Sequence, residues 1–321
     1  GPFLRARARQ MSGHWPMSAG DRLGRMQMQD RSVGIKRVQI KRAYGQLGKM
    51  TRQLERVPEG IRLPSVLLWL EDNAPLIREA LRAGGEGFAK ARRLPRRGER
   101  AQRLARGLMR FAPEEERIAE SLRQDLEPDI TEGELWMVPG LLLGLEALQA
   151  VEAAQAAMAM LEALEALRGE NRRGLRSAWG QWSDRRRAAF VAAAYGIAGD
   201  GESRRLAAAL LAERGEEPEP WLERAYKWEA EEEMAISDAV RSIAFMNQCR
   251  WWRVVERVSP AEAILREDAV HAASHPDTRR YVRKRVAKLA QDWGLEERAV
   301  ARAALARARE SEEERHRCVA W

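Results

Sequence analysis

The stretch that decides the fold is "DITEGELWMVPGLLLGLEALQAVEAAQAAMAMLEALEAL", residues 129–167. Thr131 is followed three residues later by Glu134, which is the spacing of a capping box at the start of a helix. Beyond Pro139, Leu, Ala and Met dominate, with Glu at intervals, so a helix through this region has a broad apolar face. The stretch therefore predicts a long, largely buried helix.

A proline lies inside this predicted helix. Pro139 lacks the N–H that would bond to the carbonyl of Leu135, so we expect the helix to bend there. Trp136 lies one turn earlier, and we expect its ring to be buried on the inside of the bend. Thr131, Glu134, Trp136 and Pro139 are thus assigned a structural role. A catalytic role for Glu132 or Glu134 is the less favoured alternative.

The rest of the chain repeats the helical pattern. Ala, Leu, Glu and Arg are abundant, Thr and aromatic residues are scarce, and no run of alternating β-branched residues occurs. We expect an all-α protein, a multi-helix array of antiparallel helices. Pro75 is expected to kink or divide one helix, and Gly84-Gly85 to end it. The predicted helices span residues 36–56, 64–83, 104–111, 113–126, 131–167, 175–198, 201–214, 220–258, 260–270, 277–293 and 295–310.

Charge and composition suggest four segments. Residues 1–60 hold 13 Lys and Arg against 4 Asp and Glu, whereas the other 261 residues balance to −1. We expect a poorly ordered basic leader over residues 1–35, helical subdomains over 36–170 and 171–310, and a truncated tail over 311–321. The leader could contact an anionic membrane surface or nucleic acid, but a solvated tail is the favoured interpretation and nucleic acid is disfavoured.

Two further features bear on the compartment. The two cysteines, Cys249 and Cys318, are too few for a disulfide framework and fit a reducing environment. The longest uncharged stretches, residues 135–145 and 188–199, are shorter than the roughly 20 apolar residues of a membrane span. We therefore expect a soluble chain without a membrane-spanning helix, and we expect Cys249 to be a buried small side chain.

Trp251 and Trp252, beside Arg253, are the candidate contacts for a glycan or a partner. Their rings could stack on sugars, but neighbouring side chains on a helix point about 100° apart, so at most one ring is expected in the core. Core packing is the favoured interpretation for the pair. No catalytic or cofactor-binding residue is assigned.

Two other patterns are interpreted as structural. His271 and His275 have the i, i+4 spacing of metal ligands, but Pro276 interrupts a helix through them and no cysteine accompanies them, so a loop is favoured over a metal site. The basic stretch "RRLPRRGER", residues 92–100, could bind phosphate, but a solvated loop is favoured because no aromatic residues are interleaved.

Four segments resemble the N-terminal region of bacterial cyclic β-1,2-glucan synthases, in the order of that family. The best match is "LEPDITEGELWMVPGLLLGLEALQ", residues 126–149, which shares a Thr-x-Gly-Glu-Leu-Trp…Pro pattern. The others are residues 69–81 ("WLEDNAPLIREAL"), 231–268 and 277–308. Val254-Val255 replace an aromatic pair of the family, Asp268-Ala269 an Asp-Pro, and Ser274-His275 a Met-Asp.

The resemblance implies a function outside catalysis. In that family the similar region precedes a membrane-embedded transferase that polymerises glucose from UDP-glucose, and glucan-processing domains follow. This chain has no D-x-D followed by Q-x-x-R-W, so UDP-glucose and a divalent metal are expected only for the transferase domain. We expect a module at the cytoplasmic face of the cell membrane that scaffolds the transferase or contacts the growing β-1,2-glucan. The alternatives are an α-helical carbohydrate-active enzyme on β-glucan and a basic adaptor or nucleic-acid-binding module.

Overall fold

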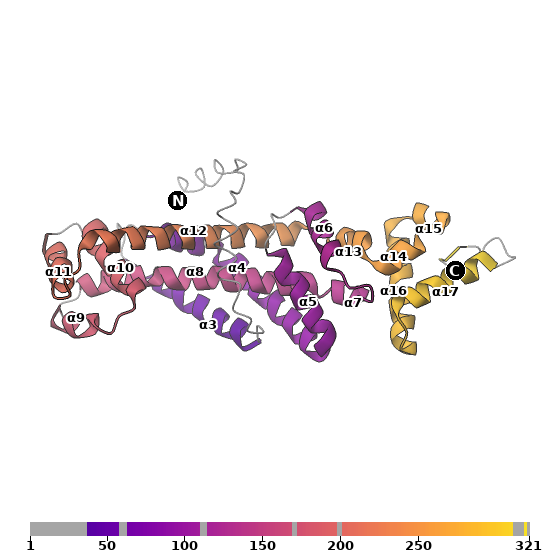
Figure 1. Cartoon of the computed structure of the whole chain (residues 1–321), viewed down its shortest axis with the longest axis horizontal. Coiled ribbons are helices and arrows are strands. Elements are labelled where there is room, and N and C mark those ends of the chain that lie inside the picture. The colour runs from indigo at the N-terminus through magenta and orange to yellow at the C-terminus, as the bar shows by residue number, and fades with distance from the viewer. Residues whose placement is uncertain are drawn as a thin grey trace. The chain divides into compact units, whose positions relative to one another are not determined.

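The computed structural model describes residues 37–57, 63–109, 114–168, 172–197, 201–310 and 318–319. Every regular element in these residues is a helix (Figure 1), which confirms the all-α prediction. The predicted leader and nearly all of the predicted tail lie outside the described residues. The helices are α3 (Arg37–Leu54), α4 (Ser65–Arg93), α5 (Pro95–Leu108), α6 (Glu115–Asp125), α7 (Glu132–Leu135), α8 (Val138–Arg168), α9 (Arg172–Trp179), α10 (Asp184–Ala192), the π-helical turn η1 (Ala193–Ile197), α11 (Gly201–Ala212), α12 (Pro218–Gln248), α13 (Trp251–Val258), α14 (Pro260–Leu265), α15 (Ala269–Ala273), α16 (Pro276–Trp293) and α17 (Glu297–Glu310).

Helix α8 is the centre of the core. It packs most extensively against α4 and α12, which lie beside it in Figure 1, and also against α3, α5 and α10. The stretch Glu132–Leu167 is long and apolar enough to cross a membrane by length and composition alone, contrary to the expectation from its uncharged runs. However, 72% of its most apolar window is buried by the protein, as in the core helix of a helical bundle.

Two glycines of α4 lie directly against two glycines of α8. A Cβ on Gly84 would be 2.3 Å from the Cα of Gly144, and one on Gly87 would be 3.0 Å from the carbonyl carbon of Gly140. The prediction that Gly84-Gly85 ends the helix is wrong, because α4 continues to Arg93. Because Gly84 has no side chain, it permits close contact between the backbones of two helices. The local sequence does not predict this contact, since the partner lies on another helix.

The predicted bend at Pro139 is instead a break between two helices. α7 ends at Leu135, and Pro139 is the second residue of α8, where its missing N–H costs nothing. The carbonyl of Leu135, which Pro139 cannot satisfy, accepts a hydrogen bond of 3.0 Å from the indole Nε1 of Trp251. At the break, the carbonyl that has no partner within its own helix is therefore hydrogen-bonded to a residue of α13, far along the chain.

Several other helix limits differ from the predictions. α4 runs through Pro75 without ending, and the basic stretch 92–100 is not a loop, because it is the end of α4 and the start of α5. The predicted helix over 220–258 is interrupted at Cys249 and Arg250, between α12 and α13.

The described helices form one unit, Lys36–Trp321. α12 packs on both α4 and α8, across the subdomain boundary expected at residue 170, so that division stays a prediction. Helices α14, α16 and α17 have a small core of their own, built from Ala261, Leu265, Val282, Val286 and Ala301. This core lies beside the polar groups described next.

Candidate functional site

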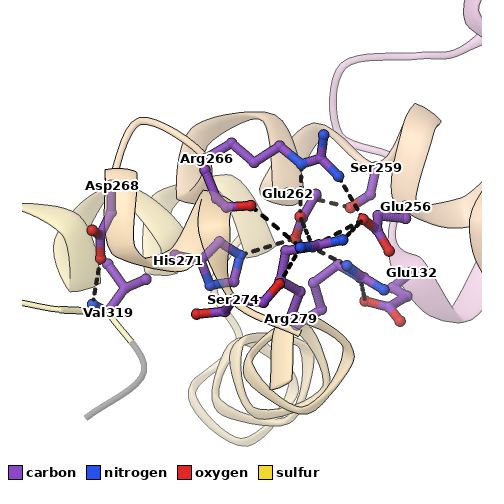
Figure 2. Close-up of polar contacts among 12 residues, drawn as sticks. Glu132, Glu256, Ser259, Glu262, Arg266, Asp268, His271, Ser274, Arg279 and Val319 are labelled. Carbon is purple, nitrogen blue, oxygen red and sulfur yellow. Dashed lines mark hydrogen bonds and ion pairs between the residues drawn. The ribbon is translucent and has the colours of Figure 1, made fainter. Parts of the chain in front are cut away.

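A network of buried charges joins α7 to the helices that follow α12. Its centre is Glu262 on α14, which is fully buried (Figure 2). The Oε1 atom of Glu262 accepts from the Nε of Arg266 at 2.9 Å, and its Oε2 atom accepts from the Nη1 of Arg283 at 3.0 Å. Burial raises the pKa of the Glu262 carboxyl, but the hydrogen bonds with His271, Arg266 and Arg283 outweigh this effect and hold the pKa below its usual range. Glu262 is therefore a buried anion.

Arg283 links this anion to the capped segment. Its side chain is fully buried on α16, and its Nε lies 3.5 Å from the Oε2 of Glu132 on α7. Glu132 in turn accepts from the indole Nε1 of Trp136 at 3.0 Å. One guanidinium thus contacts carboxylates that are 130 positions apart in the chain. The loss of this guanidinium would remove the cation beside Glu132 and one of the cationic partners of Glu262.

A second arginine ties α13 to the same network. Glu256 on α13 accepts from the Nε and the Nη2 of Arg279 through its Oε1, at 2.9 and 2.7 Å. Arg279 also donates to the carbonyls of Ala272 and Ser274, so it closes the turn between α15 and α16. These contacts fix the three short helices α13, α14 and α15 to α16.

His271 is part of the network. It is fully buried on α15, and its Nε2 lies 3.2 Å from the Oε2 of Glu262 (Figure 2). The loop predicted for this segment is therefore wrong at His271. His275 instead caps α16 by accepting from the N–H of Asp277. Among the residues that the structure describes, no group of three His, Cys, Asp or Glu side chains is arranged to hold a metal ion.

The capping box predicted at Thr131 and Glu134 is confirmed. The Glu134 N–H donates to the Thr131 hydroxyl, and the Thr131 N–H donates to the Oε2 of Glu134 at 2.8 Å. Glu134 is fully buried and also accepts from the Nε of Arg100 at 2.7 Å. Arg100 comes from the basic stretch expected to be solvated, and it further pairs with Asp129, whose pKa it lowers. Glu134 therefore has a full set of structural partners.

An open pocket of about 290 Å³ adjoins this network. Trp136, Ala287, Ala290 and Leu295 supply its apolar surface, and its polar lining includes Arg97, Thr131, Glu132, Lys284, Lys288, Gln291 and Glu297. The residues come from α5, α7, α16 and the start of α17. The pocket thus lies where the two halves of the chain meet.

Among the ionisable groups that line the pocket, Glu297 has a strongly shifted pKa. Its Oε2 accepts from the N–H of Glu132 at 2.9 Å, a buried contact. Burial raises the pKa of Glu297 to about 7, and the nearby charge of Glu132 acts in the same direction, although the Glu132 N–H and Arg97 oppose it. A carboxyl group with its pKa near neutrality can donate or accept a hydrogen bond.

Trp136 does not have the fully buried position predicted for it. The ring is half-buried and lines the pocket, and the guanidinium of Arg280 lies over it at 5.4 Å from the ring centre. Because the helix breaks at Trp136, the ring faces α16 rather than the inside of a bend. Trp136 is thus both a structural anchor and a pocket wall.

The tryptophan pair behaves as the helical spacing predicts. Trp251 is buried and bonds to Leu135, so its ring offers no face to a sugar, whereas Trp252 is half-buried with Arg253 over it at 5.2 Å. A glycan contact at Trp252 and Arg253 stays a prediction. Cys249, expected to be buried, is half-buried at the end of α12, and burial raises the pKa of its thiol to about 11.

The sequence signals of the network were weak. Arg283 lies between Val282 and Val286 on the apolar face of its helix, which is the one local sign that it is buried. Glu262, Glu256 and Glu297 resemble the many solvent-exposed acids of the chain. Comparison with protein-family models finds no match for this chain, and no curated protein matches it.

Proposed function

We propose that this chain is a non-catalytic helical module of a cyclic β-1,2-glucan synthase-like membrane glycosyltransferase. It would act at the cytoplasmic face of the membrane, scaffold the transferase and contact the growing glucan. The proposal starts from four segments that resemble the family and from the lack of a transferase motif in the sequence.

One observation carries the proposal. Three of the four family-like segments meet in the buried network, through Glu132 from residues 126–149, Glu262 from residues 231–268 and Arg283 from residues 277–308. Trp251 and Glu297 add hydrogen bonds between the same segments. The segments that resemble the family therefore meet in the interior of the module. Contacts in the interior usually reflect packing and not binding or catalysis, so this distribution supports a structural role.

The proposal is tested with the coding sequence and with two assays. The sequence after residue 321 should encode membrane helices and a transferase, and their lack would overturn the proposal. The purified chain should incorporate no glucose from UDP-glucose into β-1,2-glucan; incorporation would refute the non-catalytic role. In the complete polypeptide, Arg283→Met should reduce glucan output, whereas the matched exposed change Arg285→Met should not.

A second candidate function is a carbohydrate-active enzyme, and Glu297 favours it. A carboxyl group with a pKa near 7 beside a pocket is suited to act as a general acid. Its neighbour Glu132 is less suited to be the second carboxylate of a glycosidase, because Trp136 and Arg283 already occupy its oxygens. Product release from β-1,2-glucan that disappears in Glu297→Gln would support this candidate.

A further inference from the structure

The pocket beside Trp136 has three cationic side chains in its lining. Arg97 comes from α5, and Lys284 and Lys288 come from successive turns of α16, so the two lysines share a helix face. All three side chains are exposed. The charge of Arg97 acts on the carboxyl groups of Glu297 and Asp129. By contrast, Arg100 and Arg283 nearby are held by carboxylates. The pocket therefore carries a local excess of positive charge.

The acidic residues of the pocket offset this charge only in part. Glu132 is engaged by the indole of Trp136 and by Arg283. Glu297 is partly protonated at neutral pH because of its burial. A ligand that neutralises the pocket must consequently be an anion.

The remaining lining selects for a ring with hydroxyl groups. Trp136 lines the pocket, and its indole is held by the hydrogen bond to Glu132 and by Arg280 over one face of the ring. An aromatic side chain held in this way can pack against the C–H groups of a sugar ring. Glu297 uses one oxygen for the Glu132 N–H, and its other oxygen has no hydrogen bond to a described residue. Gln291 adds a side-chain amide.

The size of the pocket limits the ligand. A volume of about 290 Å³ is at the lower end of small-molecule sites, which span roughly 300–1,000 Å³. Such a space accommodates a single sugar ring with one anionic substituent and excludes a dinucleotide.

We propose that this pocket binds a small hydroxylated organic anion, a sugar acid or a sugar phosphate, with its anionic group on Lys284, Lys288 and Arg97 and its ring on Trp136. The chemistry is the same for a carboxylate and a phosphate, and the experiment below distinguishes them. The inference does not depend on the proposed scaffold function, because a neutral β-glucan would make no use of the three cations.

The test is isothermal titration calorimetry of the whole chain with four probes, namely glucuronate, glucose 6-phosphate, glucose and inorganic phosphate. We expect at least one of the two sugar anions to bind, and the tighter one identifies the anionic group. Glucose and inorganic phosphate should each bind at least tenfold more weakly. Failure of both sugar anions to bind at about 10 mM would overturn the inference, as would equal binding of glucose or of phosphate.

Matched variants locate the binding. Lys284→Gln with Lys288→Gln should weaken binding at least tenfold, while Arg285→Gln should leave it unchanged. Arg285 is exposed on the same helix but does not line the pocket. The control variant therefore removes a positive charge from α16 without changing the pocket. An equal loss of affinity in the double lysine variant and in Arg285→Gln would show non-specific electrostatic attraction and would refute the site. Circular dichroism of each variant checks that the helices are intact.

Discussion

The contact between α4 and α8 gives opposite predictions for two neighbouring glycines. In Gly84→Ala the new Cβ would lie 2.3 Å from the Cα and 2.9 Å from the N of Gly144. Both atoms belong to the backbone and cannot rotate away, so the two central helices must separate. In Gly85→Ala the nearest atom is the Cγ2 of Ile40 at 3.6 Å, an ordinary van der Waals contact.

The magnitudes follow from this difference. Overpacking a core costs about 1–3 kcal/mol, and a clash between two backbones belongs at the upper end, so we expect Gly84→Ala to lower the free energy of unfolding by about 2–3 kcal/mol. Gly85→Ala should raise it by up to about 1 kcal/mol, because alanine is a better helix former than glycine. The two variants carry the same chemical change at adjacent positions.

Urea denaturation followed by circular dichroism at 222 nm measures both effects. We expect the two midpoints to shift in opposite directions from the wild-type value. Equal stability of the two variants, or a stabilised Gly84→Ala, would mean that α4 and α8 do not pack through these glycines.

Three further changes test the network and the pocket. Arg283→Met should destabilise the chain by about 3–5 kcal/mol in urea denaturation, since it removes the buried cation that lies between Glu132 and Glu262. Arg285→Met should change stability by less than about 0.5 kcal/mol, and similar losses in the two variants would contradict the buried network. Trp136→Ala should cost about 2 kcal/mol, less than for a fully buried indole, and a loss of 4 kcal/mol or more would show a ring in the core. The pKa of Glu297 in the folded state is raised from 4.5 to about 7, so its contribution to stability is full below pH 4.5 and is lost as the pH rises through 7. Between pH 4.5 and about pH 8, the free energy of unfolding of Glu297→Gln should therefore rise by up to about 3 kcal/mol relative to that of the wild type. A difference that does not change with pH would refute the raised pKa.

The failures of the sequence-based predictions have a common physical cause. Glycine is common just past the end of a helix, which predicts an end at Gly84, yet the residue is needed where Gly144 approaches from another helix. The basic stretch around Arg100 predicts a solvated side chain, yet Arg100 donates a hydrogen bond to the buried carboxylate of Glu134. In each case the deciding partner lies at least 30 positions away, beyond any local pattern.

The sequence by itself determined the features that depend on neighbouring residues. The helical period and the rarity of β-branched runs specified an all-α protein, and the Thr131–Glu134 spacing specified the capping box. Gly294, between two predicted helices, adopts the left-handed conformation that ends α16. These are local properties, because a backbone hydrogen bond in a helix spans only four residues.

Only the tertiary structure decided which charges are buried and where the pocket lies. Glu262, Arg283 and Glu132 are ordinary helix-surface residue types, and they become an interior network because α7, α14 and α16 meet. Burial of a charge is favourable only when partners from other helices are already in place, so it cannot be computed from one segment. The pocket at Trp136 has the same origin, since its walls come from four separate parts of the chain.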